Sequence, residues 1–171
     1  MTTTILPLWP HILFAILEPL SLIGGWLLPI LDLNSFITDQ IPQLVATHST
    51  IHPTSVALAY QLANLYGLLC ILGLAIVYST TEPIVLRNYF IALAVADVGH
   101  IYVTYLAMGW ATFKDVGAWN VLTWGNVGVT TFLLMNRILY LGGVFGVARA
   151  SSAPSIWVDH SKASVAVKKR A

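Results

Sequence analysis

Two ionisable residues, Asp97 and His100, stand three positions apart in "VADVGHIYVTYLAMGW", one of the most apolar stretches of the chain. Residues three apart are neighbours on one face of a helix, so the carboxyl group and the imidazole can act together. A carboxyl group that burial keeps neutral can donate a proton to a substrate, and a histidine can take a proton back. The pair therefore predicts an acid–base site inside an apolar environment.

Other apolar stretches carry polar residues at a similar depth. At about 1.5 Å of rise per residue, Glu18, Asp97 and Arg137 each lie roughly 15 to 20 Å from the same side of a membrane. Asn64 lies at roughly 20 Å, with Tyr60 and Gln61 about one turn further on. An Asp or Arg at this depth costs about 2.5 to 3.5 kcal/mol on insertion, so these side chains are predicted to face a shared interior cavity.

This layer gives two sets of candidate site residues. The catalytic candidates are the two acids and the histidine. The substrate-binding candidates are polar and aromatic residues, of which Tyr102, Tyr105 and Trp124 could stabilise a carbocation through their ring faces. The catalytic set is Asp97, His100 and Glu18, and the substrate-binding set is Tyr60, Gln61, Asn64, Tyr102, Tyr105, Trp124, Asn126 and Arg137.

Each candidate also has a purely structural interpretation. Asp97 and Arg137 could form a buried ion pair that only holds helices together. Glu18 could satisfy a backbone group freed by Pro19. Gln61 and Asn64 could be interhelical hydrogen-bonding groups of small energetic value.

The composition identifies the elements that must position these residues. The chain has 171 residues, 57% of them hydrophobic and 9% charged, with a mean hydropathy of +0.79. Soluble domains have about 25% charged residues, so a membrane protein is indicated.

Charge-poor runs at 8–31, 56–78, 88–111 and 121–147 each reach the length of about 20 residues that a membrane helix needs. Period-2 alternation is absent, which excludes a barrel. We predict an all-α fold, a polytopic four-helix transmembrane bundle over residues 1–147, followed by a basic cytosolic tail at 148–171.

The distribution of Lys and Arg predicts the orientation of this bundle. Four spans place both termini on one side, and the side richer in Lys and Arg is cytosolic. That side carries Arg87, Arg149, Lys162, Lys168, Lys169 and Arg170, and the other side carries Lys114. The chain ends in "KKRA", which resembles the dilysine signal for retrieval to the endoplasmic reticulum. The alternative is a basic tail that touches anionic lipid.

Several chemistries lack the residues they need. The sequence contains no glycine-rich phosphate loop and no nucleophile elbow. His48 and His52 have no further ligands near them, so neither a metal nor another cofactor is expected. The net charge of +1 gives no reason to expect nucleic acid.

Four segments resemble the landmarks of a fungal family of small four-span membrane proteins that share a domain of unknown function. They are "LPLWPHILFAILEPLSLIGG", "YQLANLYGLL", "ADVGHIYVTY" and "NVLTWGNVGVTTFLLMNRILYLGG", and they cover about residues 6 to 146. The resemblance implies the fold and a fungal source. More loosely, the layout is similar to the EXPERA group, which includes the emopamil-binding protein, a sterol isomerase. Those proteins also place polar and acidic residues around a cavity for a hydrophobic ligand.

Two functions remain open at this point. The first is a membrane enzyme that performs cofactor-free acid–base chemistry, namely isomerisation, cyclisation or epoxide opening, on a terpenoid, sterol or polyketide in fungal secondary metabolism. The second is a non-catalytic lipid or sterol binder, or a partner subunit of another membrane enzyme. Either way the expected partners are a lipophilic small molecule and membrane lipids, and a homodimer remains open.

Overall fold

The computed structural model describes residues 4–42 and 51–146, and every regular element among them is a helix. The predicted tail at 148–171, including the KKRA end and most of the cytosolic Lys and Arg, lies outside the described residues. The elements in chain order are α1 (Leu8–Ile12), η1 (Leu13–Leu17), α2 (Glu18–Leu31), α3 (Leu33–Thr38), α4 (Pro53–Ser79), α5 (Pro83–Lys114), η2 (Val116–Ala118), α6 (Val121–Thr123), η3 (Trp124–Val129) and α7 (Thr130–Leu141).

Three helical segments are long and apolar enough to cross a membrane, which confirms the predicted class of membrane protein. They are Leu8–Leu31, Pro53–Ser79 and Pro83–Lys114, and they include the predicted spans at 8–31, 56–78 and 88–111. Each of the two longer helices begins with a proline at its first turn, where a missing N–H costs nothing. α5 contains a break at Gly109, whose φ of 74° a side chain would disfavour.

The segment expected as a fourth span is helical from Val121 to Leu141, through α6, η3 and α7. It does not reach residue 147, because Gly142 ends the helix and Gly143 follows with a positive φ of 79°. Asn126, Asn136 and Arg137 make this segment less apolar than the other three.

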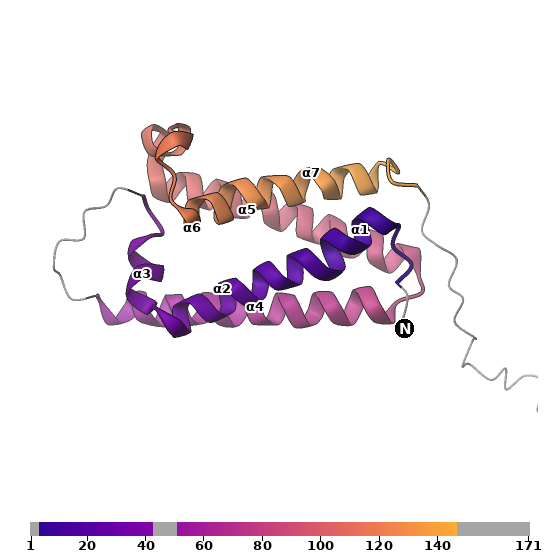
Figure 1. Cartoon of the computed structure of the whole chain (residues 1–171), viewed down its shortest axis with the longest axis horizontal. Helices are drawn as coiled ribbons and strands as arrows, with labels where there is room; N and C mark the ends of the chain where they lie inside the picture. Colours follow the sequence, from indigo (N-terminus) through magenta and orange to yellow (C-terminus); the bar gives the residue numbers. More distant parts are fainter. Residues whose placement is uncertain (1–3, 43–50, 147–171) are drawn as a thin grey trace, which may run out of the picture.

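The helices form two closely packed pairs, α2 with α4 and α5 with α7 (Figure 1). On α4 the packed face is a stripe of mostly small residues, which lets the two backbones approach each other. The buried residues of this stripe are Ala59, Ala63, Gly67, Cys70, Gly73 and Val77. The cavity described below lies between these two pairs.

An apolar core joins the two pairs at one end of the molecule. Phe14 of η1 stacks on Phe90 of α5 with ring centroids 4.7 Å apart. The other buried members of this cluster are Ile5, Leu6, Leu13, Ala15, Val77, Leu86 and Leu133. α1 and the end of α7 both lie at this end, whereas α3 and α6 lie at the opposite end (Figure 1).

The first helix is distorted where the sequence places a proline. Pro19 has no N–H, so the carbonyl of Ala15, four residues earlier, loses its helical partner. The five residues before Glu18 form a π-helical turn, and the Tyr78 hydroxyl donates a hydrogen bond of 3.4 Å to that carbonyl. The helix therefore continues through Pro19 with its free backbone group satisfied from α4.

Much of the outer surface of the helices is apolar. Leucine, isoleucine, valine and aromatic side chains on α2, α4, α5 and α7 remain exposed along the length of the bundle. A water-soluble monomer rarely exposes apolar patches larger than a few hundred Å². This surface fits a hydrocarbon environment, in agreement with the three candidate spans.

Candidate functional site

Arg137 of α7 is paired with two carboxylates that come from two other helices. Its guanidinium donates to Glu18 Oε1 at the start of α2 and to Asp97 Oδ2 in the middle of α5. The three side chains are 1%, 11% and 13% exposed respectively. The triad connects both helix pairs at the centre of the molecule, and we call it the Glu18–Arg137–Asp97 triad.

The local sequence explains how each member reaches this point. Glu18 follows the π-helical turn directly, and this turn rotates the helix by one extra residue before Pro19. Asp97 lies on the face of α5 that packs against α7. Arg137 extends towards both acids from the buried side of α7, next to the Phe14 ring, which lies 5.4 Å from its Cζ atom. This ring–cation contact adds to the stabilisation of the guanidinium.

The charges of the triad do not cancel. Two ionised carboxylates and one guanidinium carry a net charge of −1, which is costly in a low-dielectric interior. The excess charge can be removed by one proton shared between the two acids.

A partly enclosed cavity of about 750 Å³ lies beside the triad. It is lined by α2, α3, α4, α5, α6, η3 and α7, so it lies in the space between the two helix pairs. The apolar part of its wall consists of Leu22, Leu28, Phe36, Leu62, Leu65, Leu69, Leu93, Leu122, Val129 and Leu133. Ligand pockets for small molecules usually fall between about 300 and 1,000 Å³ and have mostly apolar walls, which this cavity matches.

Five of the predicted site residues line this one cavity. They are Glu18, Asp97, His100, Asn126 and Arg137. In the described part of the chain no hydrogen bond joins the His100 ring to Asp97, and the neighbour of the ring is the side chain of Asn126. His100 thus lies in the wall of the same cavity as the triad, beside Asn126.

Three predicted residues of α4 lie outside the cavity. Tyr60, Gln61 and Asn64 are exposed on the outer side of the helix. The reason is the small-residue stripe: α4 turns this stripe towards α2, and Leu62, Leu65, Tyr66 and Leu69 then face the cavity. The polar side chains of α4 therefore do not belong to the polar layer that was predicted from their depth in the membrane.

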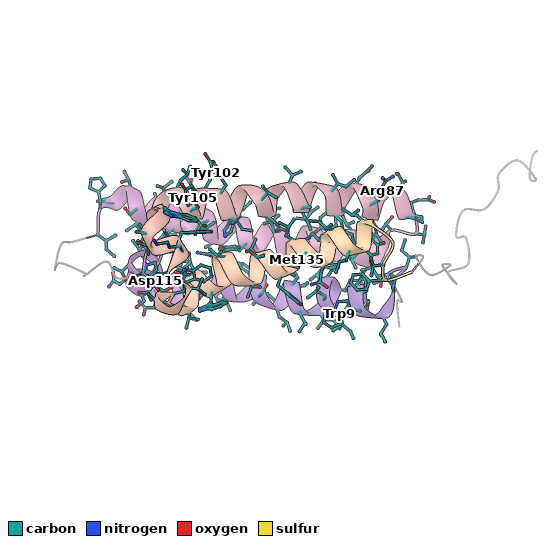
Figure 2. The ribbon with its side chains drawn as sticks, turned by 90° about the horizontal axis from the view of Figure 1, so that it is seen from above. Trp9, Arg87, Tyr102, Tyr105, Asp115 and Met135 are labelled. Atoms are coloured by element: carbon teal, nitrogen blue, oxygen red, sulfur yellow. The ribbon has the colours of Figure 1, made fainter. Side chains whose placement is uncertain are left out.

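Three predicted aromatic residues also lie elsewhere. Tyr102 and Tyr105 line a separate apolar groove on the surface of α5, together with Trp110 and Phe113. Figure 2 shows both tyrosines near the end of the molecule that carries Asp115, opposite Arg87. Trp124 is half exposed and packs against Trp119 at a centroid distance of 5.2 Å. The structure does not bring these rings to the triad.

The cavity contains residues that the sequence did not single out. Tyr66 and Tyr89 line its inner part, and Asp32, Ser35 and Asp39 line the part near α3. Tyr66 packs against Gly25, and Tyr89 against Gly73. A signal was present in both cases, since a glycine in an apolar helix often marks the close approach of a large side chain from a neighbouring helix.

Hydrogen bonds across the two helix pairs fix the site from both sides. Trp9 donates to Asn136 Oδ1 over 2.9 Å, one position from Arg137. At the other end Asn120 Nδ2 donates to the Asp39 carbonyl over 2.8 Å. These contacts hold α7 against α1 and the start of α6 against the end of α3. They therefore help to fix the positions of the triad and of the cavity wall.

No group of three or more His, Cys, Asp or Glu side chains that could hold a metal ion occurs among residues 4–42 and 51–146. The polar chemistry of the cavity consists of two carboxyl groups, one guanidinium, one imidazole and one amide near the triad. These groups can donate and accept protons and hydrogen bonds to a molecule within the cavity.

Comparison with known proteins gives the family of the chain. No curated protein and no solved structure matches it significantly. The family described as "Domain of unknown function (DUF7704)" matches residues 3–147. This confirms the predicted shared domain of unknown function, whereas the fungal source and the likeness to the EXPERA group stay predictions. Because the match covers most of the sequence, the chain belongs to the DUF7704 family.

Proposed function

We propose that this protein is a membrane enzyme that binds a lipophilic small molecule in the cavity and performs cofactor-free proton transfer on it. The reaction class is isomerisation, cyclisation or epoxide opening of a terpenoid, sterol or polyketide. The observation that carries the proposal is the meeting of Glu18, Asp97, Arg137 and His100 at one apolar cavity.

The roles follow from the charges and the geometry. Arg137 holds one carboxylate ionised, and the second carboxyl group can carry the excess proton and act as the acid. Asp97 is the preferred donor because it is on the same helix face as His100, and Glu18 is the alternative. His100 accepts the proton that the product releases. The apolar walls hold the hydrocarbon part of the substrate and exclude water from the reacting atoms.

The triad itself favours a second function, a non-catalytic binder or partner subunit. Arg137 uses both terminal nitrogens on the two acids, as a purely structural tie would. In that case the cavity would hold a lipid or sterol, and the polar residues would only fix its orientation.

Product analysis distinguishes these two functions. The full chain, reconstituted in lipid nanodiscs, is incubated with a lipid extract of the cells in which it naturally occurs. Mass spectrometry then follows the lipophilic compounds over time. An enzyme converts a compound into an isomer of the same mass or into its hydrate without an added cofactor. A binder retains a compound and releases it unchanged.

Matched variants connect the reaction to the site. Asp97→Asn keeps the shape of the side chain and removes its proton, so conversion should fall by about 10²- to 10⁴-fold, as for other acid–base groups. Asp115→Asn makes the same chemical change at an exposed position outside the cavity and should leave conversion unchanged. If Asp97→Asn and His100→Gln both convert the compound at the rate of the unaltered chain, the acid–base assignment is wrong.

We also propose the membrane topology that the sequence predicts. Four spans, with Val121–Leu141 as the fourth, place both termini in the cytosol. This proposal is supported by the inward direction of the polar residues of α7, since Asn136 and Arg137 are both buried.

The proposed location is the endoplasmic reticulum, and replacing both Lys168 and Lys169 by serine should move a tagged protein to later compartments.

A further inference from the structure

Polar side chains on the outer face of α4 take no part in the cavity. Gln61 and Asn64 are exposed there, together with Tyr60, in a helix that is otherwise strongly apolar. At the rise of an α-helix, the two amides lie roughly 12 and 17 Å from the start of α4 at Pro53. The hydrocarbon core of a bilayer is about 30 Å thick and α4 is about 40 Å long, so both amides lie within the hydrocarbon.

The described part of one copy gives these amides no hydrogen-bond partner. Within residues 4–42 and 51–146, the hydrogen bonds of α4 side chains are made by His52, Thr54, Cys70, Tyr78 and Ser79. Lipid tails offer neither a donor nor an acceptor, so an amide that faces them without a partner is costly. Two such groups about one turn apart therefore indicate that another helix covers this face of α4.

The neighbours of the two amides follow the spacing of a helix–helix contact. Exposed residues recur along α4 in alternating steps of four and three, which is the heptad spacing of helices that pack side by side. They are Ala57, Gln61, Asn64, Leu68, Ile71 and Ala75, and we call them the outer stripe of α4. α4 meets α2 with its small-residue stripe and the cavity with leucines and Tyr66, so the outer stripe faces neither of them. Figure 1 shows α4 at the edge of the bundle over its whole length.

We propose that the outer stripe of α4 is the interface between two copies of this chain. Copies of a membrane protein share one orientation, so a two-fold axis along the membrane normal brings α4 against α4 in parallel. Each residue of the stripe then meets its own counterpart at the same depth. An amide can donate and accept at once, so the two Asn64 side chains satisfy each other, as do the two Gln61 side chains. This self-complementarity favours a second copy over a different partner, and it does not depend on the proposed reaction.

The first experiment counts the copies in a bilayer. The full chain, labelled with one fluorophore at a C-terminal tag, is reconstituted into phosphatidylcholine vesicles at decreasing protein-to-lipid ratios, and bleaching steps are counted in single vesicles. We expect two steps for the unaltered chain. Gln61→Leu with Asn64→Leu should weaken dimerisation by about tenfold, since hydrogen bonds are lost from both copies. This variant places leucines against lipid, so thermal unfolding should show that it remains folded.

A matched variant separates the amides from the shape of the stripe. The exchange Gln61→Asn with Asn64→Gln keeps an amide at each position. It should keep the affinity of the dimer within about threefold of the unaltered chain, because donor and acceptor remain on both copies.

Cysteine cross-linking identifies the face that forms the contact. Leu68→Cys places a thiol in the outer stripe, and Val95→Cys places one on α5 at a comparable distance from the turn between α4 and α5. The two positions are 55% and 69% exposed, and the native Cys70 is buried against α2. Oxidation by copper phenanthroline in vesicles should cross-link the Leu68→Cys variant about tenfold faster, because a disulfide needs its two Cβ atoms close together.

Three results would each overturn the proposal. The first is single-step bleaching of the unaltered chain at every protein-to-lipid ratio, which leaves a helix of another protein as the cover of α4. The second is a dimer of unchanged affinity in the Gln61→Leu, Asn64→Leu variant. The third is faster cross-linking through Val95→Cys than through Leu68→Cys. None of these measurements involves the conversion of a lipophilic compound, so a failure of the interface is distinct from a failure of the proposed function.

Discussion

Arg137 is the residue on which the centre of the molecule depends. Its side chain is 1% exposed, and it is bound to carboxylates from α2 and α5 at the same time. A buried ion pair stabilises a fold little more than apolar side chains of similar shape would. Replacing only one partner, however, leaves the other charge buried without a counter-charge. We therefore expect a single substitution in the triad to destabilise the fold more than a combined substitution that removes all its charges.

The first prediction follows from this asymmetry. Arg137→Gln leaves Glu18 and Asp97 facing each other without a cation, and breaking a buried pair in this way typically costs about 3–5 kcal/mol. Thermal unfolding in nanodiscs, followed by tryptophan fluorescence, should therefore begin at a clearly lower temperature. The triple change Glu18→Gln, Asp97→Asn, Arg137→Gln removes all the charges and should recover much of the loss. If Arg137→Gln melts with the unaltered chain, the triad does not stabilise the fold.

A second residue, Asp32, acts outside the membrane-spanning segments. The hydrogen bonds from Ser35 hold the pKa of the Asp32 carboxyl below its ordinary value of 3.8. A group whose pKa is lowered by folding stabilises the folded state above its unfolded pKa, and that contribution is lost as the pH falls through the folded pKa. The cap of α3 is thus complete at neutral pH and fails only in acid below 3.8.

Hydrogen exchange measures this cap. Asp32→Ala removes the acceptor for the Ser35 N–H, so the amides of α3 should exchange faster at neutral pH. Asp32→Asn keeps an acceptor oxygen that does not titrate. Its exchange at neutral pH should resemble that of the unaltered chain, and the additional opening of α3 in acid should disappear. Equal protection in the Ala variant would show that packing alone holds α3.

At the scale of elements, α2 and α4 pack closely against each other. Gly25 of α2 faces the Tyr66 ring of α4, and Gly67 of α4 faces the Trp26 ring of α2. The two glycine–aromatic contacts are reciprocal, which fixes both the separation and the register of the pair. Because the same packing turns Tyr66 towards the cavity, the geometry of the site depends on it.

Two adjacent glycines provide a test with an internal control. A Cβ atom at Gly25 would lie 2.9 Å from the Tyr66 ring, whereas one at Gly24 meets nothing within 4 Å. Gly25→Ala should lower the stability by about 1–3 kcal/mol, since the ring or the helix must move. Gly24→Ala should be neutral or slightly stabilising, because alanine favours the helix. Thermal unfolding of the two variants under one condition decides the matter, and equal stability would contradict the register described here.

At the scale of the whole molecule, the two helix pairs meet through an apolar core at one end and through hydrogen bonds at the other. The core contains Phe14 and Phe90, and the opposite end is held by Asn120 and by Asn126, which donates to Gln40 over 3.4 Å. The cluster of buried apolar residues lies at the first end, so we expect the end near α3 to open first.

The topology is a prediction at this same scale. Arg87 lies near the end of the molecule where α1 begins and α7 ends (Figures 1 and 2). With the basic residues of the tail, this end is expected in the cytosol. A glycosylation acceptor fused after Ala171 should remain unmodified, and one inserted between α5 and α6 should be glycosylated. The opposite pattern would overturn the orientation and the dilysine interpretation together.

The sequence by itself determined the class of fold and the residues of the Glu18–Arg137–Asp97 triad. The long apolar runs indicate membrane helices because only a helix satisfies its own backbone in lipid. The cost of burying a charge identified Glu18, Asp97 and Arg137 as inward-facing residues, and the structure joins them. Depth could be counted from the sequence because the rise per residue of a helix is constant.

Only the tertiary structure decided which way each helix is rotated. The exposed position of Gln61 and Asn64 results from packing of the small-residue stripe of α4 on α2, which outweighs the weak preference of amides for the interior. The pairing of Arg137 with both acids, rather than with Asp97 alone, depends on the π-helical turn before Pro19 that sets the direction of Glu18. Asp32, Ser35 and Asp39 line the cavity because α3 follows α2 directly and packs against α2 and α4. The rotation of each helix about its axis and the position of α3 depend on contacts between residues far apart in the chain. The helical periodicity of a single segment carries no information about these contacts.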